Sequence, residues 1–199
     1  MRELLERKDG PAIRDTLIWF ALLFGFGIAG YLTWGTWWAV IPFAAYGVIY
    51  ASTSDARWHE HGHGTAFKTD WMNNAMYELA SFMVLRESTV WRWSHTRHHS
   101  DTIIVGRDPE IAVPRPTNLF NFITNFFSLG AFKKYWREMP MHAVGRFTAD
   151  EMTFIPESEK SAIIWRARLY LVIYAAVIAL AISMGSILPL MYIGLPTFY

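Results

Sequence analysis

The sequence contains no cysteine, and charged residues make up only 18% of its 199 residues, against about 25% in an ordinary soluble domain. The absence of cysteine excludes a disulfide scaffold, a cysteine-ligated zinc site, a thiolate nucleophile and an iron–sulfur cluster held by this chain alone. The formal net charge is +1, so we expect no nucleic acid or other polyanion as a partner. The chain is 53% hydrophobic, which favours a membrane protein over a typical cytosolic enzyme.

The first long stretch without any charged residue covers residues 16–54. As one helix it would be about 58 Å long at about 1.5 Å per residue, nearly twice a hydrocarbon core of about 30 Å. A helical hairpin fits better. We expect one span over residues 16–34, a turn at Gly35 and a second span over residues 37–54, bent at Pro42.

The second charge-free stretch covers residues 169–199. It predicts one span over residues 169–184, a break beginning at Gly185 and the start of another span. All 18 Lys and Arg residues lie outside the two stretches, so the positive-inside rule places the charged segments in the cytoplasm. The predicted organisation is a cytoplasmic N-terminal segment (1–15), a transmembrane hairpin (16–54), a cytoplasmic or interfacial region (55–168) and a second, incomplete hairpin (169–199).

The sequence of the charged middle region predicts several separate helices. Apolar side chains recur at helical spacing over residues 71–85, which predicts a helix there. Residues 117–136 are rich in phenylalanine and end in basic residues, a pattern typical of a helix lying in the membrane surface. The sequence therefore predicts an all-α, multi-pass membrane protein, which we expect in a bacterial inner membrane.

Six of the seven histidines fall between residues 59 and 99, in two groups. Residues four apart share a helix face, so His59 and His63 point the same way, as do His95 and His99, with His98 beside them. Two such faces could hold metal through five imidazoles. Imidazole suits zinc, copper, iron and nickel, and five ligands exceed what one four-coordinate zinc needs. Many nitrogens and no thiolate leave iron or zinc as the leading candidates, and the number of imidazoles favours more than one metal or a metal of higher coordination. Of these we favour a pair of iron ions.

Other polar residues near the two groups have less certain roles. His61 lies about 200° from the face that His59 and His63 share, so its role as a further ligand stays open. His142 stands apart and is expected to have a structural or surface role. Carboxylates near the groups could accept the outer N–H of a ligand histidine or be solvated or helix-capping; they are Glu60, Asp70, Asp101 and Asp108.

The two motifs resemble the first two histidine boxes of integral-membrane fatty acid desaturases. The matching residues are Trp58-His59-Glu60-His61-Gly62-His63-Gly64-Thr65-Ala66-Phe67 and His95-Thr96-Arg97-His98-His99, and the preceding hairpin also fits, so the resemblance covers about residues 16–199. It implies that His59, His63, His95, His98 and His99 are di-iron ligands and that an acyl lipid is oxidised with O₂. It also implies an external electron donor of the ferredoxin, rubredoxin or cytochrome type. Related alkane and fatty acid hydroxylases share these boxes.

One departure from the family pattern concerns the third histidine box. No histidine follows His142, whereas the family has a further HxxHH motif downstream and about eight imidazoles in all. We expect that the chain is truncated before this box, with a degenerate site as the alternative. As given, the 199 residues are expected to bind iron weakly or not at all and to be inactive.

Two other functions remain open from the sequence. His59-Glu60-His61-Gly62-His63 also satisfies HExxH, so an intramembrane zinc metalloprotease with Glu60 as general base is an alternative. The second histidine group would be redundant for its single zinc. A metal-binding or purely structural membrane subunit is the non-enzyme alternative.

Overall fold

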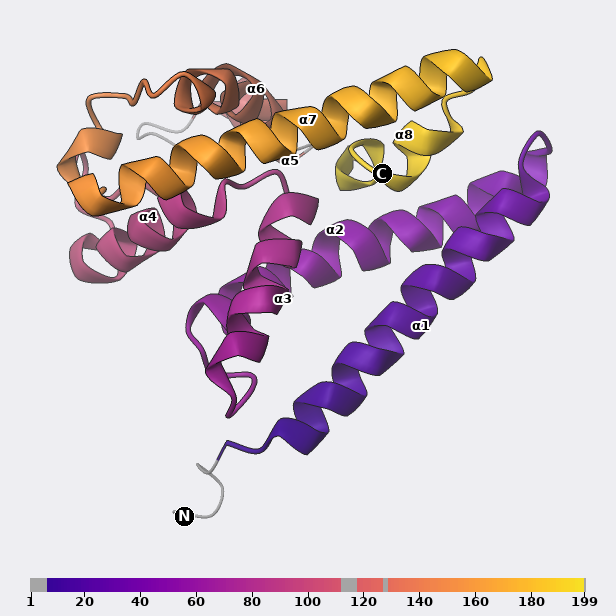
Figure 1. The fold of residues 1–199 in the computed structure, drawn as a ribbon, viewed down its shortest axis with the longest axis horizontal. Helices are drawn as coiled ribbons and strands as arrows, with labels where there is room; N and C mark the ends of the chain where they lie inside the picture. The colour runs from indigo at the N-terminus through magenta and orange to yellow at the C-terminus, as the bar shows by residue number, and fades with distance from the viewer. Residues whose placement is uncertain (1–6, 112–117, 127–128, 199) are drawn as a thin grey trace. The chain divides into compact units, whose positions relative to one another are not determined.

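The computed structural model describes residues 7–111, 118–126 and 129–198, which are helical with no strand among them (Figure 1). The chain divides into two compact units, one comprising residues 1–84 and 177–199 and the other residues 85–176. In chain order the elements are α1 (Asp9–Thr33), η2 (Trp37–Ala39), α2 (Val40–Gly62), α3 (Asp70–Met83), α4 (Ser88–Asp101), α5 (Leu119–Phe126), α6 (Leu129–Ala143), η3 (Glu151–Thr153), η4 (Glu157–Glu159), α7 (Lys160–Met184), α8 (Leu188–Tyr192) and η5 (Leu195–Phe198). The all-α prediction is confirmed.

The first unit is built on the hairpin of α1 and α2, which lie side by side (Figure 1). The turn between them contains Gly35 at φ +84°, a backbone conformation that glycine adopts without steric cost. Pro42 is the third residue of α2. The predicted bend there is not needed, because the first turn of a helix requires no backbone N–H from proline.

Two glycines of α1 allow α2 to come close. A Cβ added at Gly30 would lie 2.9 Å from ring carbons of Phe43, and one at Gly27 would lie 3.4 Å from the ring of Tyr46. Phe43 is only 3% exposed and packs edge-on against Trp34. Its ring therefore has little room to move away.

We expect Gly30→Ala to lower the free energy of unfolding by about 1–3 kcal/mol, the usual cost of overpacking a close contact. Gly25 on the same helix is the matched control, because a Cβ there meets nothing within 4 Å. Gly25→Ala should leave stability unchanged or raise it, since alanine favours helix by about 1 kcal/mol over glycine. Thermal unfolding in detergent measures both. Equal effects of the two substitutions would contradict the close packing at Phe43.

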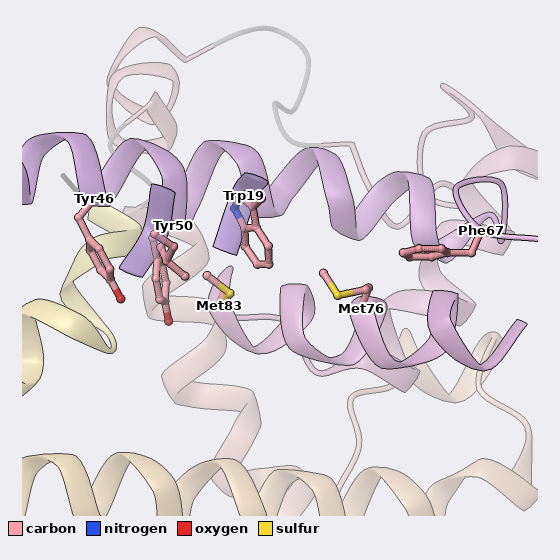
Figure 2. Close-up of a cluster of buried hydrophobic side chains, with 7 residues drawn as sticks. Trp19, Tyr46, Tyr50, Phe67, Met76 and Met83 are labelled. Carbon is pink, nitrogen blue, oxygen red and sulfur yellow. The ribbon is translucent and has the colours of Figure 1, made fainter. Parts of the chain in front are cut away.

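The core of the first unit lies where α3 packs on α2. Met76 and Met83 of α3 face Trp19, Tyr50 and Phe67, as Figure 2 shows. The Trp19 indole N–H also donates a hydrogen bond to the Ile49 carbonyl oxygen at 3.1 Å. The helix predicted over residues 71–85 is thus confirmed as α3, with its apolar side on this core.

The C-terminal residues of the first unit fold against the hairpin. α7 ends at Met184, as the sequence predicts, and Gly185 follows at φ +57°. The short helix α8 then places the Tyr192 hydroxyl 2.7 Å from the Gly27 carbonyl oxygen, to which it donates. The Thr197 hydroxyl donates to the Met83 carbonyl oxygen at 3.0 Å.

The second unit positions α4, which carries the second histidine group. Glu87 caps the N-terminus of α4, because its carboxylate accepts a hydrogen bond from the Val90 N–H at 2.7 Å. The Arg166 guanidinium on α7 donates to the same carboxylate at 3.2 Å and also to the Thr89 hydroxyl. Val90 packs with Ile163 in a small apolar cluster. The start of α4 is therefore anchored to α7 by both charge and packing.

Residues predicted as one surface helix, 117–136, form parts of two helices, α5 and α6. Residues 117 and 127–128 lie outside the described residues. The apolar side chains of α5 that the structure describes are all exposed, namely Leu119, Phe120, Phe122 and Ile123. Its placement in a membrane surface stays a prediction.

Two helices in the described chain are long and apolar enough to span a membrane. They are α1 and the segment Glu157–Met184, which contains α7. Only 22% of the most apolar window of each is buried, whereas the core helix of a soluble protein would be mostly buried. α2 does not qualify, because its last third carries Asp55, Arg57 and the first histidines. The crossing of α2 and the predicted segment boundaries stay predictions.

Candidate metal centre

The first histidine group lies at the C-terminal end of α2. His59 is in the last turn and His63 is the C-cap. Their Nε2 atoms face each other at 3.2 Å, with ring centroids 4.7 Å apart. Consider two nitrogens that bind one metal at about 2.1 Å each. They lie about 3.0–3.4 Å apart when the N–metal–N angle is between a right angle and the tetrahedral angle. The predicted pair therefore has the spacing of two ligands of one ion.

His61 of the same motif lies apart from this pair. It is 3% exposed, stacks on the Phe67 ring, and its Nδ1 is 3.3 Å from the Asn73 side-chain oxygen. The Asn73 amide also bonds both backbone groups of Phe67, accepting from its N–H and donating to its carbonyl oxygen. The structure gives His61 a place in the packing of the loop after α2.

The second histidine group occupies the last turns of α4. The Nε2 atoms of His95 and His99 are 3.1 Å apart, again the spacing of two ligands of one ion. The His98 ring stacks with that of His95 at a centroid distance of 5.8 Å. The shared face that i, i+4 spacing predicts is therefore present.

Two carboxylates hold the outer nitrogens of this second group. Asp108 Oδ1 is 2.9 Å from His98 Nδ1, and Glu110 Oε2 is 2.9 Å from His95 Nδ1. An imidazole that donates its Nδ1–H to a carboxylate leaves the Nε2 lone pair for a metal. Asp108 thus lies at hydrogen-bond distance from the outer nitrogen of a histidine, and its role behind a metal ligand stays a prediction. The sequence reasoning missed Glu110, and its only signal was its place two residues beyond Asp108.

The loop after α4 is organised around the Asp108 carboxylate. Asp108 also accepts hydrogen bonds from the N–H groups of Ile103 and Glu110, both at 2.9 Å. Partial desolvation raises the pKa of Asp108, but the hydrogen bonds from His98 and the two N–H groups outweigh it, and the net pKa is lowered. Asp108 therefore stays ionised as a partner for His98.

Three other carboxylates predicted as possible partners of histidine are placed differently. Asp101 pairs with Arg97 at 2.5 Å and with Arg107 at 2.9 Å. Glu60 is exposed on α2, and Asp70 lies exposed in the first turn of α3. No hydrogen bond from a histidine to these three is seen in the described residues.

The two histidine groups belong to different units. Each presents a pair of imidazoles at ligand spacing, and the second adds outer carboxylates. Such neutral nitrogen ligands with hydrogen-bonded carboxylates behind them fit iron or zinc. The residues present therefore fit the metal that the sequence predicts.

The seventh histidine, His142, is distant from both histidine groups in the sequence. It belongs to a buried hydrogen-bond network. Its Nε2 is 2.9 Å from a carboxylate oxygen of Glu151, and Thr148 donates to the other oxygen through its N–H and hydroxyl. Burial raises the pKa of Glu151, but these hydrogen bonds outweigh it and lower the pKa below the ordinary value of 4.5. The structure thus gives His142 the predicted structural place.

This network predicts a stability change in acid. A carboxyl whose pKa is lower in the folded state stabilises the fold above its ordinary pKa, and that contribution is lost as pH falls through the folded value. We expect the melting temperature to fall below about pH 4.5. Glu151→Gln should be about 2 kcal/mol less stable at pH 7, because hydrogen bonds to the charged group are lost, and its melting temperature should change less in acid.

The control for this prediction is Glu157→Gln, since the Glu157 side chain is 86% exposed and, within the described residues, pairs with Lys160 alone. It should keep the wild-type pH profile. Thermal unfolding in detergent between pH 7 and pH 3.5 measures all three proteins. An identical slope for Glu151→Gln and wild type would contradict the prediction.

Together these features define a helical protein with membrane-length helices and histidine pairs suited to a redox metal. The family model described as fatty acid desaturase matches residues 35–199, and the chain belongs to the fatty acid desaturase family. No curated protein and no solved structure was found to match the chain. Membership supports a desaturase-like function, that of a membrane oxidoreductase acting on fatty acids, in a family that generally uses two irons.

Proposed function

We propose that this protein is a di-iron desaturase that removes hydrogen from the acyl chain of a lipid with O₂. His59, His63, His95, His98 and His99 are the proposed ligands. The observation that carries the proposal is the facing of Nε2 atoms at 3.1–3.2 Å within each histidine group, in a chain of the fatty acid desaturase family. The irons, when bound, supply the oxidation of an unactivated C–H bond, which acid–base side chains cannot achieve.

The residues of this chain have distinct tasks in the proposed site. Asp108 and Glu110 fix the tautomer and orientation of His98 and His95, so that each Nε2 is available for metal. The cap by Glu87 and its bonds to Arg166 fix the start of α4. This preorganisation keeps the ligands near one geometry, on which accurate positioning of an acyl carbon depends.

The proposed surroundings follow from the apolar surface. α1 and α7 span the bilayer, the exposed apolar side chains of α5 face lipid, and the histidine groups lie on the cytoplasmic side of a bacterial inner membrane. Electrons come from a ferredoxin, rubredoxin or cytochrome-type donor. Because the 199 residues contain only seven histidines, we also propose that these residues alone hold iron weakly and are inactive.

Metal analysis and lipid analysis test the proposal together. Protein purified after expression of its natural gene should contain two irons, and expressing cells should gain an unsaturated acyl chain. An alcohol in place of the double bond would support the hydroxylases that share the two boxes. A single zinc with peptidase activity would support the HExxH alternative, with Glu60 as the base. The absence of both metal and product would support a structural subunit.

A further inference from the structure

The loop that joins α2 to α3, residues 64–69, is held by side chains at the start of α1 and just before it (Figure 1). The Arg7 guanidinium donates a hydrogen bond to the Gly64 carbonyl oxygen. The Asp9 carboxylate accepts two from Thr69, one from its N–H at 3.0 Å and one from its hydroxyl at 2.6 Å. These partners are 57 and 60 residues apart in the sequence, and all of them belong to the first unit. The contact is therefore a tertiary one, which no local repeat produces.

This loop starts directly after His63, the C-cap of α2. Gly64 has φ +65°, and its N–H donates to the His61 carbonyl oxygen at 3.0 Å. The Thr65 N–H donates to the Glu60 carbonyl oxygen at 3.3 Å. These two bonds are those of a Schellman motif, which closes a helix with a left-handed glycine. The backbone of His63 therefore lies at the junction of helix and loop, and the direction of its side chain depends on both.

Thr69 occupies the N-cap of α3, but its side chain does not cap that helix. A threonine at this position usually accepts a hydrogen bond from an N–H of the first turn, which stabilises the helix. Its hydroxyl instead donates to the Asp9 carboxylate, and hydrogen bonds to a charged group are stronger than those between neutral groups. The bond to the distant residue therefore takes the place of local capping.

The bonds from Arg7 and Asp9 act at the two ends of the loop, and a different contact acts in its middle. Phe67 is buried in the core of the first unit at 1% exposed. The Asn73 side chain of α3 bonds its N–H and its carbonyl oxygen at 3.0 and 2.9 Å. The middle of the loop is thus fixed by α3, whereas its ends receive their contacts from the segment that begins α1.

We propose that Arg7 and Asp9 are positioning residues for His63. By holding both ends of the loop they keep the His63 Nε2 atom 3.2 Å from the His59 Nε2 atom, the spacing of two ligands of one ion. They touch neither metal nor substrate and act through the loop alone. A metal site binds well only when the residues around its ligands keep their geometry within narrow limits. The inference rests on the proposed function, in which both histidines are metal ligands.

Metal titration tests this positioning role in the protein expressed from its natural gene. The metal-free protein in detergent is titrated with ferrous iron. Asp9→Ala removes both bonds to Thr69, and we expect it to weaken iron binding about tenfold, the lower end of the range of about 10–100-fold for the loss of a group behind a ligand. Hydrogen exchange of the metal-free variant should be faster in residues 64–69, because the Thr69 N–H loses its acceptor.

Asp9→Ala also removes an acidic residue from the first turn of α1, which weakens that helix. Two variants of Thr69 separate this effect from the contact with the loop, since they leave α1 unchanged. Thr69→Val loses the hydroxyl bond and should bind iron with an affinity between those of wild type and Asp9→Ala. Thr69→Ser keeps the hydroxyl and should bind iron as the wild type does. A double variant with Asp9→Ala and Thr69→Val should bind no more weakly than Asp9→Ala, because the hydroxyl has already lost its partner.

The matched control is Lys8→Ala. Lys8 precedes Asp9, is exposed and makes no cap hydrogen bond to α1, so its replacement changes the charge of the same segment without removing a contact to the loop. It should bind iron as the wild type does. A purely structural role of Asp9 would lower the melting temperature of the metal-free protein and leave the iron affinity unchanged, so both quantities are measured for each variant.

Two kinds of outcome are distinguishable. Wild-type iron affinity in Asp9→Ala or in Thr69→Val would overturn the positioning role, as would equal losses in Thr69→Ser and Thr69→Val, or in Lys8→Ala and Asp9→Ala. These results would leave the proposed function standing, because the wild type still binds iron. Absence of iron binding by the wild type would overturn the proposed function and the positioning role together.

Discussion

In the protein expressed from its natural gene, replacing His98 by alanine should reduce product formation at least about a hundredfold, since the loss of a partner behind a ligand alone costs about 10–100-fold in metal affinity or activity. His98 belongs to the group in which His95 and His99 lie at ligand spacing. Its loss should therefore lower both iron content and lipid oxidation. The same result is expected for His63→Ala, which breaks the 3.2 Å pair with His59. Iron per chain and acyl composition of expressing cells are the two measurements.

The control for these substitutions is Thr96→Ala. Thr96 is exposed on the same helix as His98, and its hydroxyl donates only to the Arg92 carbonyl oxygen. It should retain iron and product. If His98→Ala expressed normally and kept full product, a catalytic role for the second group would be refuted. Retention of one zinc and peptidase activity in that variant would favour the HExxH alternative, in which His59 and His63 are two of the zinc ligands and a third comes from elsewhere.

The second large effect is expected for Asp108→Ala. Its carboxylate holds His98 Nδ1 and the N–H of Ile103. Ile103 has φ +68°, a conformation that β-branched residues rarely adopt, so the loop relies on this bond to keep its shape. We expect iron affinity to fall about 10–100-fold. The loop should also become more accessible to protease.

Asp108→Asn separates the two roles of this residue. The amide keeps the size and one acceptor oxygen, so much of the loop should survive, but the negative charge behind His98 is gone. Iron affinity should then lie between those of wild type and Asp108→Ala. The exposed Asp150→Asn in the same unit is the control and should match wild type. Titration of the apoprotein with ferrous iron provides the affinities, and an unchanged affinity in Asp108→Ala would remove this positioning role.

The sequence predicts best where local periodicity decides the structure. α3 and the i, i+4 faces of His59 with His63 and of His95 with His99 follow from the repeat of the α-helix. The break at Gly185 located the end of α7 at Met184, but the last charged residue before the apolar stretch did not locate its start at Lys160. A helix begins where backbone hydrogen bonding begins, and the charged residues before position 169 do not prevent this.

Contacts made by loops could not be predicted from local periodicity. Glu110 reaches His95 only because the loop after α4 turns around Asp108, and no helical repeat specifies that turn. In the sequence, the angular position of His61 around the helix axis left open whether it is a further metal ligand. Its packing against Phe67 and Asn73 depends on how the next loop folds back.

Both histidine groups lie at the C-terminal ends of α2 and α4. The end of a helix carries the equivalent of about half a negative charge. In the proposed site, neutral imidazoles would offer no charge to compensate an oxidised metal, and the backbone dipoles would supply part of that compensation. The energy of the oxidised state would thereby be coupled to helix integrity, and fraying of either terminal turn would make a bound ion easier to reduce.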